Sequence, residues 1–243
     1  MRIIWICGIS LISLGCAIKN KANEPLHDTH PIVIISIDQL DRRGLARLFQ
    51  RLSECSPGAV GLMSLVDEPD STDIEISEYI GKLGNVVLAT LVSGDSVFRS
   101  NRLISKNAAG EGFVQFALQN GKAVGHWMLH EQNESVTWSF PLEVLAKYNI
   151  DKTDELFELS DVDVVYRIPI TSQRETFDIV HNLESIDCSS LSGKIVLIGY
   201  TEFDSDKYLV ELDGESVEMN ITIAMANTIL FLLDSKGLEE IQP

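Results

Sequence analysis

The chain has 243 residues and a formal net charge of −17, with 19 lysines and arginines against 36 aspartates and glutamates. This acidic balance argues against nucleic acid as a partner, because phosphate binding needs clustered lysine and arginine, and against electrostatic adsorption to anionic lipid. The length and the apolar content suffice for one large domain, or two small ones, with a substantial core.

Residues 1–16 form a segment separate from the folded part. After Arg2, the stretch Ile3–Leu14 is almost wholly apolar, which is typical of a secretory signal and too short for a comfortable membrane span. The ending Ser13–Cys16 resembles a bacterial lipobox, although Ser13 stands where such motifs prefer leucine. We therefore expect lipidation at Cys16 and a flexible polar tether over residues 17–30. An uncleaved anchor and a plain cleaved signal are the alternatives.

Short apolar runs alternate with helical patterns in the first third of the folded part. Asp41 is placed to cap the first helix, and Gly84 to end the second. This alternation predicts a parallel sheet with crossover helices. The expected elements are strands over Ile32–Ile37, Ala59–Val66 and Asn85–Val92 and helices over Arg42–Glu54 and Asp73–Leu83.

The middle of the chain is less regular. Residues 96–112 are expected to be a loop with a possible short helix, and Asn120-Gly121 is a hairpin signal between alternating segments. We therefore expect an antiparallel insertion, followed by a helix and a further strand. These elements are strands over Phe113–Ala117, Val124–His130, Val136–Trp138 and Asp163–Ile168 and a helix over Phe140–Tyr148.

The segment Ile195–Ile198 is a continuous apolar run flanked by glycines, as expected of a strand buried on both faces. We expect an acidic loop over Glu202–Gly214, a core helix over Ser216–Leu233 and a frayed polar tail over residues 234–243. The predicted fold class is therefore α/β, with a mostly parallel central sheet flanked by helices and an antiparallel insertion in the middle.

Carboxylates follow two of the predicted strands. Asp38 and Asp67 end the first and second strands, at the sheet edge where open α/β sheets bind ligands. Asp41 and Asp70 could join them in a site for a divalent cation or for acid–base chemistry. The alternative, which we favour, is that these carboxylates cap helices, with Asp38 retained as a ligand-binding residue.

A second group follows the strand Ile195–Ile198. This group forms either the other wall of the crevice or a solvated acidic loop. It begins with Thr201 and continues with Glu202, Asp204 and Asp206. Among the basic residues Arg42, Arg43 and Arg167, Arg167 could clamp a ligand carboxylate, although a surface ion pair explains it equally well. We predict a ligand site that includes Asp38, Asp67, Arg167 and Thr201.

No motif predicts catalysis, a metal or a cofactor. His126 and His130 do not form a His-Glu-x-x-His motif, and on a strand they would lie too far apart to chelate one ion. Gly193-Lys194 lacks the glycine spacing of a phosphate loop. No serine has a recognisable histidine partner. We therefore expect that the protein is not an enzyme and binds neither a metal nor a cofactor.

Two cysteines remain in the folded part once Cys7 and Cys16 are assigned to the leader. An exported compartment would permit a disulfide between Cys55 and Cys188. Their wide separation is weak evidence for it, and separate burial as small apolar residues is the simpler expectation.

Several segments together resemble the second class of CHASE domains, extracellular sensory modules of bacterial cyclases, histidine kinases and related receptors. The likeness covers residues 31–233, and its segments are Ile32–Asp38, Gly84–Ala89, Gly193–Gly199 and Glu215–Leu230. Two departures concern the turn Gln119–Lys122, which lacks the family's acidic residue and arginine, and Asn220, where members often carry histidine.

The resemblance implies a sensory or ligand-binding domain in the cell envelope, here on a lipid tether, periplasmic or extracellular, without its own output domain. Its partner would be a small molecule or an envelope protein. Two alternatives are a metal-dependent envelope hydrolase using Asp38 and Asp67, and a module for protein interaction.

Overall fold

The computed structural model describes residues 30–94, 96–132, 134–202 and 207–242. Its central sheet has the strand order β11-β1-β12-β2-β3, and β5 pairs with β3. These strands are all parallel, and β4 extends the end of β3 in the antiparallel sense. Their bounds are β1 Ile32–Ser36, β2 Ala59–Leu62, β3 Val86–Ser93, β4 Ser96–Phe98, β5 Gly110–Phe113, β11 Asp178–Val180 and β12 Ile195–Gly199.

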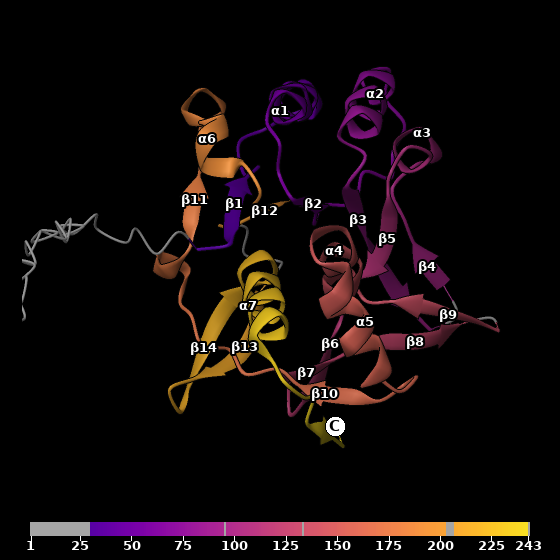
Figure 1. Cartoon of the computed structure of the whole chain (residues 1–243), viewed down its shortest axis with the longest axis vertical. Helices are drawn as coiled ribbons and strands as arrows, with labels where there is room; N and C mark the ends of the chain where they lie inside the picture. Colours follow the sequence, from indigo (N-terminus) through magenta and orange to yellow (C-terminus); the bar gives the residue numbers. More distant parts are fainter. Residues whose placement is uncertain (1–29, 95, 133, 203–206, 243) are drawn as a thin grey trace, which may run out of the picture.

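One face of this sheet is covered by α1 (Arg42–Glu54), α2 (Asp73–Leu83), α3 (Arg102–Ser105) and α6 (Cys188–Leu191). The predicted bounds of α1 and α2 are confirmed. Asp41 caps α1 by accepting a hydrogen bond from the amide of Gly44, and Gly84 ends α2 at a positive φ of 68°. Figure 1 shows these helices in the upper part of the view.

The opposite face is covered by α4 (Phe140–Tyr148) and α7 (Ile221–Asp234). Alternate residues of each central strand therefore enter two different cores: Val33 and Ile35 pack with α1, whereas Ile32 and Ile34 pack with α7. Burial on both faces explains why these strands are continuous apolar runs. The helix α5 (Ile150–Glu158), which the sequence analysis did not predict, follows α4 directly.

A second sheet lies beyond α4 and α7 (Figure 1). Its order is β14-β13-β7-β10-β15, with β6 paired to β7. The antiparallel insertion is confirmed, and Asn120 and Gly121 turn the β6–β7 hairpin at φ values of 52° and 79°. The bounds are β6 Phe116–Gln119, β7 Lys122–Trp127, β10 Val165–Arg167, β13 Lys207–Leu212, β14 Glu215–Asn220 and β15 Glu240–Ile241.

Three predictions about the polypeptide after β12 are wrong. The expected acidic loop contains β13, which pairs with β14 through a turn at Asp213-Gly214. As a result, α7 begins at Ile221 and not at Ser216. The tail is not simply frayed, because β15 pairs with β10.

The predicted strand Val124–His130 is also interrupted. It divides between β7 and β8 (Leu129–Gln132), and β8 forms a separate ribbon with β9 (Ser135–Trp138).

Cys55, at the end of α1, is joined to Cys188, at the start of α6, by a disulfide with a Cα–Cα distance of 4.8 Å. The expectation of separate burial is therefore wrong. The two helices pack on the same face of the sheet, which brings together cysteines that are 133 positions apart in sequence.

Candidate ligand crevice at the strand ends

The carboxyl ends of β1 and β12 lie side by side, because the two strands pair in parallel from Ile32–Ile195 to Ser36–Gly199. The chain leaves β1 for α1 on one face of the sheet. From β12 it continues toward the β13–β14 hairpin and α7, which packs on the opposite face. Adjacent strands whose connections part in this way create the crevice where open α/β sheets bind ligands.

Asp38 ties these two strand ends together. Its Oδ2 accepts hydrogen bonds from the hydroxyl of Thr201 at 2.8 Å and from its amide at 3.0 Å. The Ser36 hydroxyl donates to the same oxygen, and the amide of Glu202 donates to Oδ1 at 3.3 Å. Burial raises the pKa of Asp38, but these hydrogen bonds outweigh that effect and leave the pKa below its ordinary value.

The Asp38 carboxylate therefore accepts hydrogen bonds from three residues of the protein, Ser36, Thr201 and Glu202. It holds the residues after β12 in place, and Thr201, which is only 4% exposed, is fixed by it. The structure thus brings together two of the four predicted site residues, Asp38 and Thr201. Asp38 acts in this site by positioning the wall that Thr201 and Glu202 form.

A cavity of about 420 Å³ lies on the α7 side of this wall. Arg174 and Glu202 form an ion pair across its rim, with 3.0 Å between Nη2 and Oε1. The residues that line it come from the segment before β11, from the end of β12 and from the β13–β14–α7 unit, and they include Gln173, Arg174, Thr201, Glu202, Asn220 and Ile223.

Asn220, which lines this cavity, falls inside the helix that the sequence analysis predicts. It is 5% exposed and caps α7, because its Oδ1 accepts a hydrogen bond from the amide of Thr222 at 2.9 Å. Its buried Nδ2 has no hydrogen-bond partner within the described part of the chain. A buried donor without an acceptor is costly, so a group supplied by a ligand would be favoured there.

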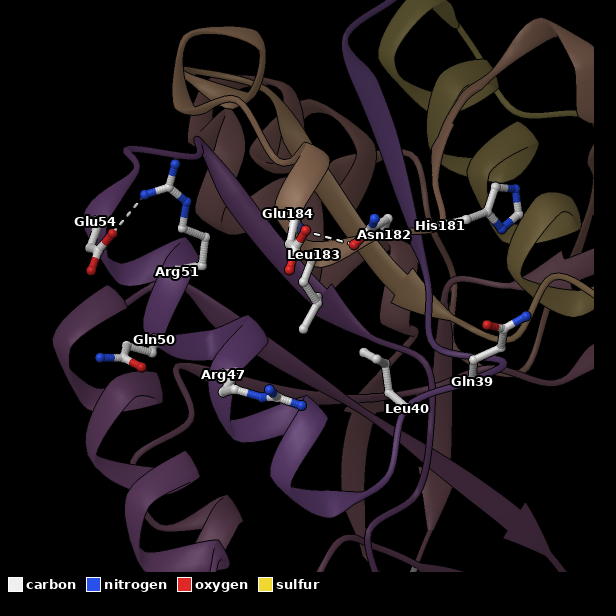
Figure 2. Close-up of a pocket in the computed structure, with 10 residues that line it drawn as sticks. All are labelled: Gln39, Leu40, Arg47, Gln50, Arg51, Glu54, His181, Asn182, Leu183 and Glu184. Atoms are coloured by element: carbon white, nitrogen blue, oxygen red, sulfur yellow. Dashed lines mark hydrogen bonds and ion pairs between the residues drawn. The ribbon is translucent and has the colours of Figure 1, made fainter.

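A larger and more open hollow, of about 1030 Å³, lies on the α1 side of Asp38. Figure 2 shows Arg47 and Arg51 reaching from α1, with His181 and Asn182, which follow β11, across from them. Gln39 belongs to this hollow and is the next residue after Asp38. Asp38 thus precedes a residue of this hollow and hydrogen-bonds to Thr201 and Glu202 of the smaller cavity.

The other predicted carboxylates do not gather around Asp38. Asp67 lies on an exposed loop, where its Oδ1 accepts a hydrogen bond from the amide of Glu68. Asp41 caps α1, and Asp70 accepts a hydrogen bond from the amide of Thr72. The preference for capping is thus confirmed for Asp41. Asp204 and Asp206 lie outside the described residues.

Among the described residues, the fully buried carboxylate is that of Asp73, at the first position of α2. It is completely buried and accepts hydrogen bonds from Nη1 of Arg42 at 2.8 Å and from Nδ2 of Asn101 at 2.9 Å. Arg42, one of the basic residues considered for ligand binding, is thus engaged in an ion pair with Asp73. An aspartate at a helix start gives no sign in the sequence of such distant partners.

Arg167 lies in the second sheet and is not brought to Asp38. Its Nε lies 3.2 Å from Oε2 of Glu239, and both side chains are largely exposed. It borders a separate cavity of about 210 Å³ whose lining includes Glu211 and Asp213. A role for Arg167 in ligand binding stays a prediction.

His126 and His130 occupy different strands, β7 and β8. His126 is completely buried, and its Nδ1 lies 2.6 Å from the carbonyl oxygen of Trp127. Burial lowers the pKa of His126 to about 4, despite the opposing effect of that hydrogen bond. His130 instead hydrogen-bonds to Asp163 at 2.6 Å. Within the described ranges, no three histidine, cysteine or acidic residues are grouped so as to hold a metal ion.

The membrane predictions concern Cys16, which lies outside the described residues. Within the described part, no helix is long and apolar enough to cross a membrane.

A family model of the CHASE2 domain matches residues 7–238. Because this match covers nearly the whole chain, the protein belongs to the CHASE2 family of extracellular sensory domains, which are typically non-catalytic. The resemblance inferred from the strand segments is therefore confirmed. No curated protein and no solved structure matches the chain.

Proposed function

We propose that this CHASE2 domain senses a small anion that carries a carboxylate or phosphate group and binds in the cavity between Thr201, Arg174 and Asn220. The observation that carries the proposal is the unpartnered Nδ2 donor of Asn220, which is buried at the wall of a cavity beside the ends of β1 and β12. Asn220 also caps α7, and the N-terminus of a helix favours negative charge.

Arg174 supplies the positive charge. Arg174 is paired with Glu202, and both side chains are partly exposed to solvent. An incoming carboxylate would replace Glu202 as the partner of the guanidinium and could bind it through two parallel hydrogen bonds. Release of Glu202 would then loosen the segment that Asp38 holds through the amides of Thr201 and Glu202.

The signal has a route out of the crevice through Asp38. The Asp38 carboxylate holds the wall of the cavity through Thr201, and the next residue in the chain, Gln39, lines the larger hollow beside α1. A change at Thr201 would therefore reach the surface formed by α1 and the segment after β11. For such coupling, the anion cavity and the hollow beside α1 must both shift the conformation of one shared element, which here is the loop that Asp38 holds.

A lipid at Cys16 would hold the domain at the membrane of the cell envelope. The lipobox-like ending of the leader supports this anchor, and the Cys55–Cys188 disulfide fits an oxidising compartment. Two lipid chains would give a stable hold on a bilayer.

A thermal-shift screen of the full chain against small carboxylates and phosphates tests the proposed ligand. A molecule that binds the native state must raise the melting temperature, by the equivalent of about 2.7 kcal/mol at a concentration of one hundred times Kd. Asn220→Asp keeps the helix cap but removes the donor and adds a repelling charge, so it should abolish the shift.

A matched pair of arginine variants separates the crevice from general surface charge. Arg174→Gln should reduce the shift, whereas Arg99→Gln should not, although Arg99 forms a comparable surface ion pair with Glu111. A panel in which no anion raises the melting temperature, or equal losses in both variants, would contradict the proposal.

A second candidate function is protein interaction, supported by the charge of α1. In a chain of net charge −17, Arg43, Arg47 and Arg51 follow one another at four-residue intervals along its exposed side. Two of them border the open hollow of Figure 2. An acidic surface of an envelope protein would fit this stripe. Arg47→Glu should then reduce crosslinking to such a partner without affecting anion binding.

A further inference from the structure

An aromatic pocket lies apart from the crevice, where the two large sheets meet. Its lining belongs to β3 and β5 of the central sheet, to β6 and β7 of the second sheet, and to β8 and the short link between β5 and β6. It encloses about 260 Å³, and its lining residues are Val92, Phe113, Gln115, Phe116, Trp127 and His130. The crevice and this pocket share no lining residue.

The walls of this pocket are rings in fixed contact. Phe113 stacks on His126 with 5.7 Å between ring centroids and meets His130 edge-on at 6.0 Å. Phe116 meets His126 edge-on at 5.2 Å. The rings of Phe113 and Phe116 both pack on the buried ring of His126, which holds these two walls of the pocket in place.

Gln115 provides a polar group at the pocket. Its Nε2 donates a hydrogen bond to the carbonyl oxygen of Val92 at 2.5 Å, which fixes the orientation of the amide, since a carbonyl oxygen can only accept. The other amide atom, Oε1, is a buried acceptor that has no partner in the described part of the chain.

Two further buried atoms near this pocket lack partners in the described segments. Thr90 lies opposite Phe113 in the β3–β5 pair, and its Oγ1 has no partner. His126 must carry its proton on Nδ1, because that atom faces the carbonyl oxygen of Trp127; its unpartnered Nε2 is therefore an acceptor. Buried polar atoms of folded proteins are normally satisfied, so the unpartnered Oε1 of Gln115, which lines the pocket, points to a ligand.

We propose that this pocket binds a small planar aromatic molecule that carries an N–H or O–H donor, of the chemical class of indole or phenol. Its ring lies against Phe113, Phe116 and Trp127, and its donor hydrogen-bonds to Oε1 of Gln115. This site is independent of the anion-binding crevice. A ligand here contacts strands of both sheets and braces the link between β5 and β6.

Calorimetric titration of the full chain with indole, phenol and 1-methylindole tests the proposal. Indole and 1-methylindole have the same ring system, but only indole has an N–H. We expect saturable binding of indole or phenol, with indole about tenfold tighter than 1-methylindole, which corresponds to one neutral hydrogen bond. Gln115→Leu keeps a side chain of similar size and should make indole and 1-methylindole bind equally.

A variant that fills the pocket provides the second arm. Val92 is only partly buried, so Val92→Phe should preserve the fold while blocking the pocket, and the exposed Val136→Phe in β9 is its control. Loss of binding in the first variant alone is expected. Absence of saturable binding by the ligand panel, or unchanged indole binding in Val92→Phe, would overturn the proposal.

Discussion

Thr201 donates both its backbone amide and its side-chain hydroxyl to the carboxylate of Asp38, at 3.0 and 2.8 Å, although the two residues are 163 positions apart. The two parallel strands bring their ends together, and Asp38 then sets where the chain after β12 lies. The strongest candidate for ligand recognition in the sequence thus holds Thr201 and Glu202 in position, and in the proposed anion site the ligand contacts would fall to the residues around it.

We expect Asp38→Ala to lower the free energy of unfolding by about 1–3 kcal/mol, because it leaves the amides and hydroxyl at Thr201 without acceptors. It should also weaken anion binding, since the wall of the cavity is released. Urea unfolding and the thermal-shift assay measure the two effects. Asp67→Ala, at an exposed carboxylate, should stay within about 0.5 kcal/mol. Equal destabilisation by both variants would show that Asp38 has no special structural role.

The disulfide should make a large contribution to stability. It closes a loop of 133 positions, and removal of a native bridge typically costs about 2–5 kcal/mol, because the unfolded chain regains freedom. Replacement of both Cys55 and Cys188 by serine should therefore lower the melting temperature, and reductant should lower it in the parent protein but not in the variant. Two free thiols at these positions in protein purified from the envelope would contradict the assignment.

The central layers could be predicted from the sequence because local signals and burial agree there. Asp41 caps a helix whose apolar residues recur at intervals of three and four, and α1 has the predicted bounds. The β13–β14 hairpin was missed because its many acidic residues were interpreted as a loop. The signal was nevertheless present, since Asp213-Gly214 is the same kind of turn as Asn120-Gly121.

The site was less predictable because it depends on distances between remote segments. Parallel pairing places Asp38 beside Thr201, whereas the sequence left open whether the Thr201 group forms a wall or a solvated loop. However, β2 ends at Leu62, and the four residues 63–66 carry the chain away from the strand end to Asp67 on an exposed loop. Asn220 was missed for a local reason: with the helix drawn from Ser216, a capping residue was interpreted as part of the helix interior.

Burial of His126 predicts a pH-dependent stability. Its pKa is about 4 in the folded protein and 6.5 in its ordinary state, so the unfolded chain binds the extra proton between these values. Stability due to this group is complete above pH 6.5 and falls as the pH is lowered toward 4, by on the order of 3 kcal/mol. Urea unfolding at a series of pH values measures this loss.

Two histidine variants isolate the contribution of His126. His126→Phe removes the titrating group but keeps a ring between Phe113 and Phe116, so this part of the pH dependence should disappear. His130→Gln, at a partly exposed position, should retain it. A pH profile that is unchanged in His126→Phe would mean that other groups cause the loss of stability.

Membrane attachment should depend on the thiol of Cys16 alone. If the leader is cleaved before this residue and the cysteine is lipidated, Cys16→Ser removes the acceptor of the lipid, and the protein should move to the soluble fraction after cell lysis. Cys7→Ser is the matched control, because Cys7 lies in the same apolar leader and would be removed with it. Fractionation with immunodetection, together with labelling by a fatty-acid analogue, gives the measurement. Membrane association and labelling that persist in Cys16→Ser would indicate an uncleaved anchor or another lipid site.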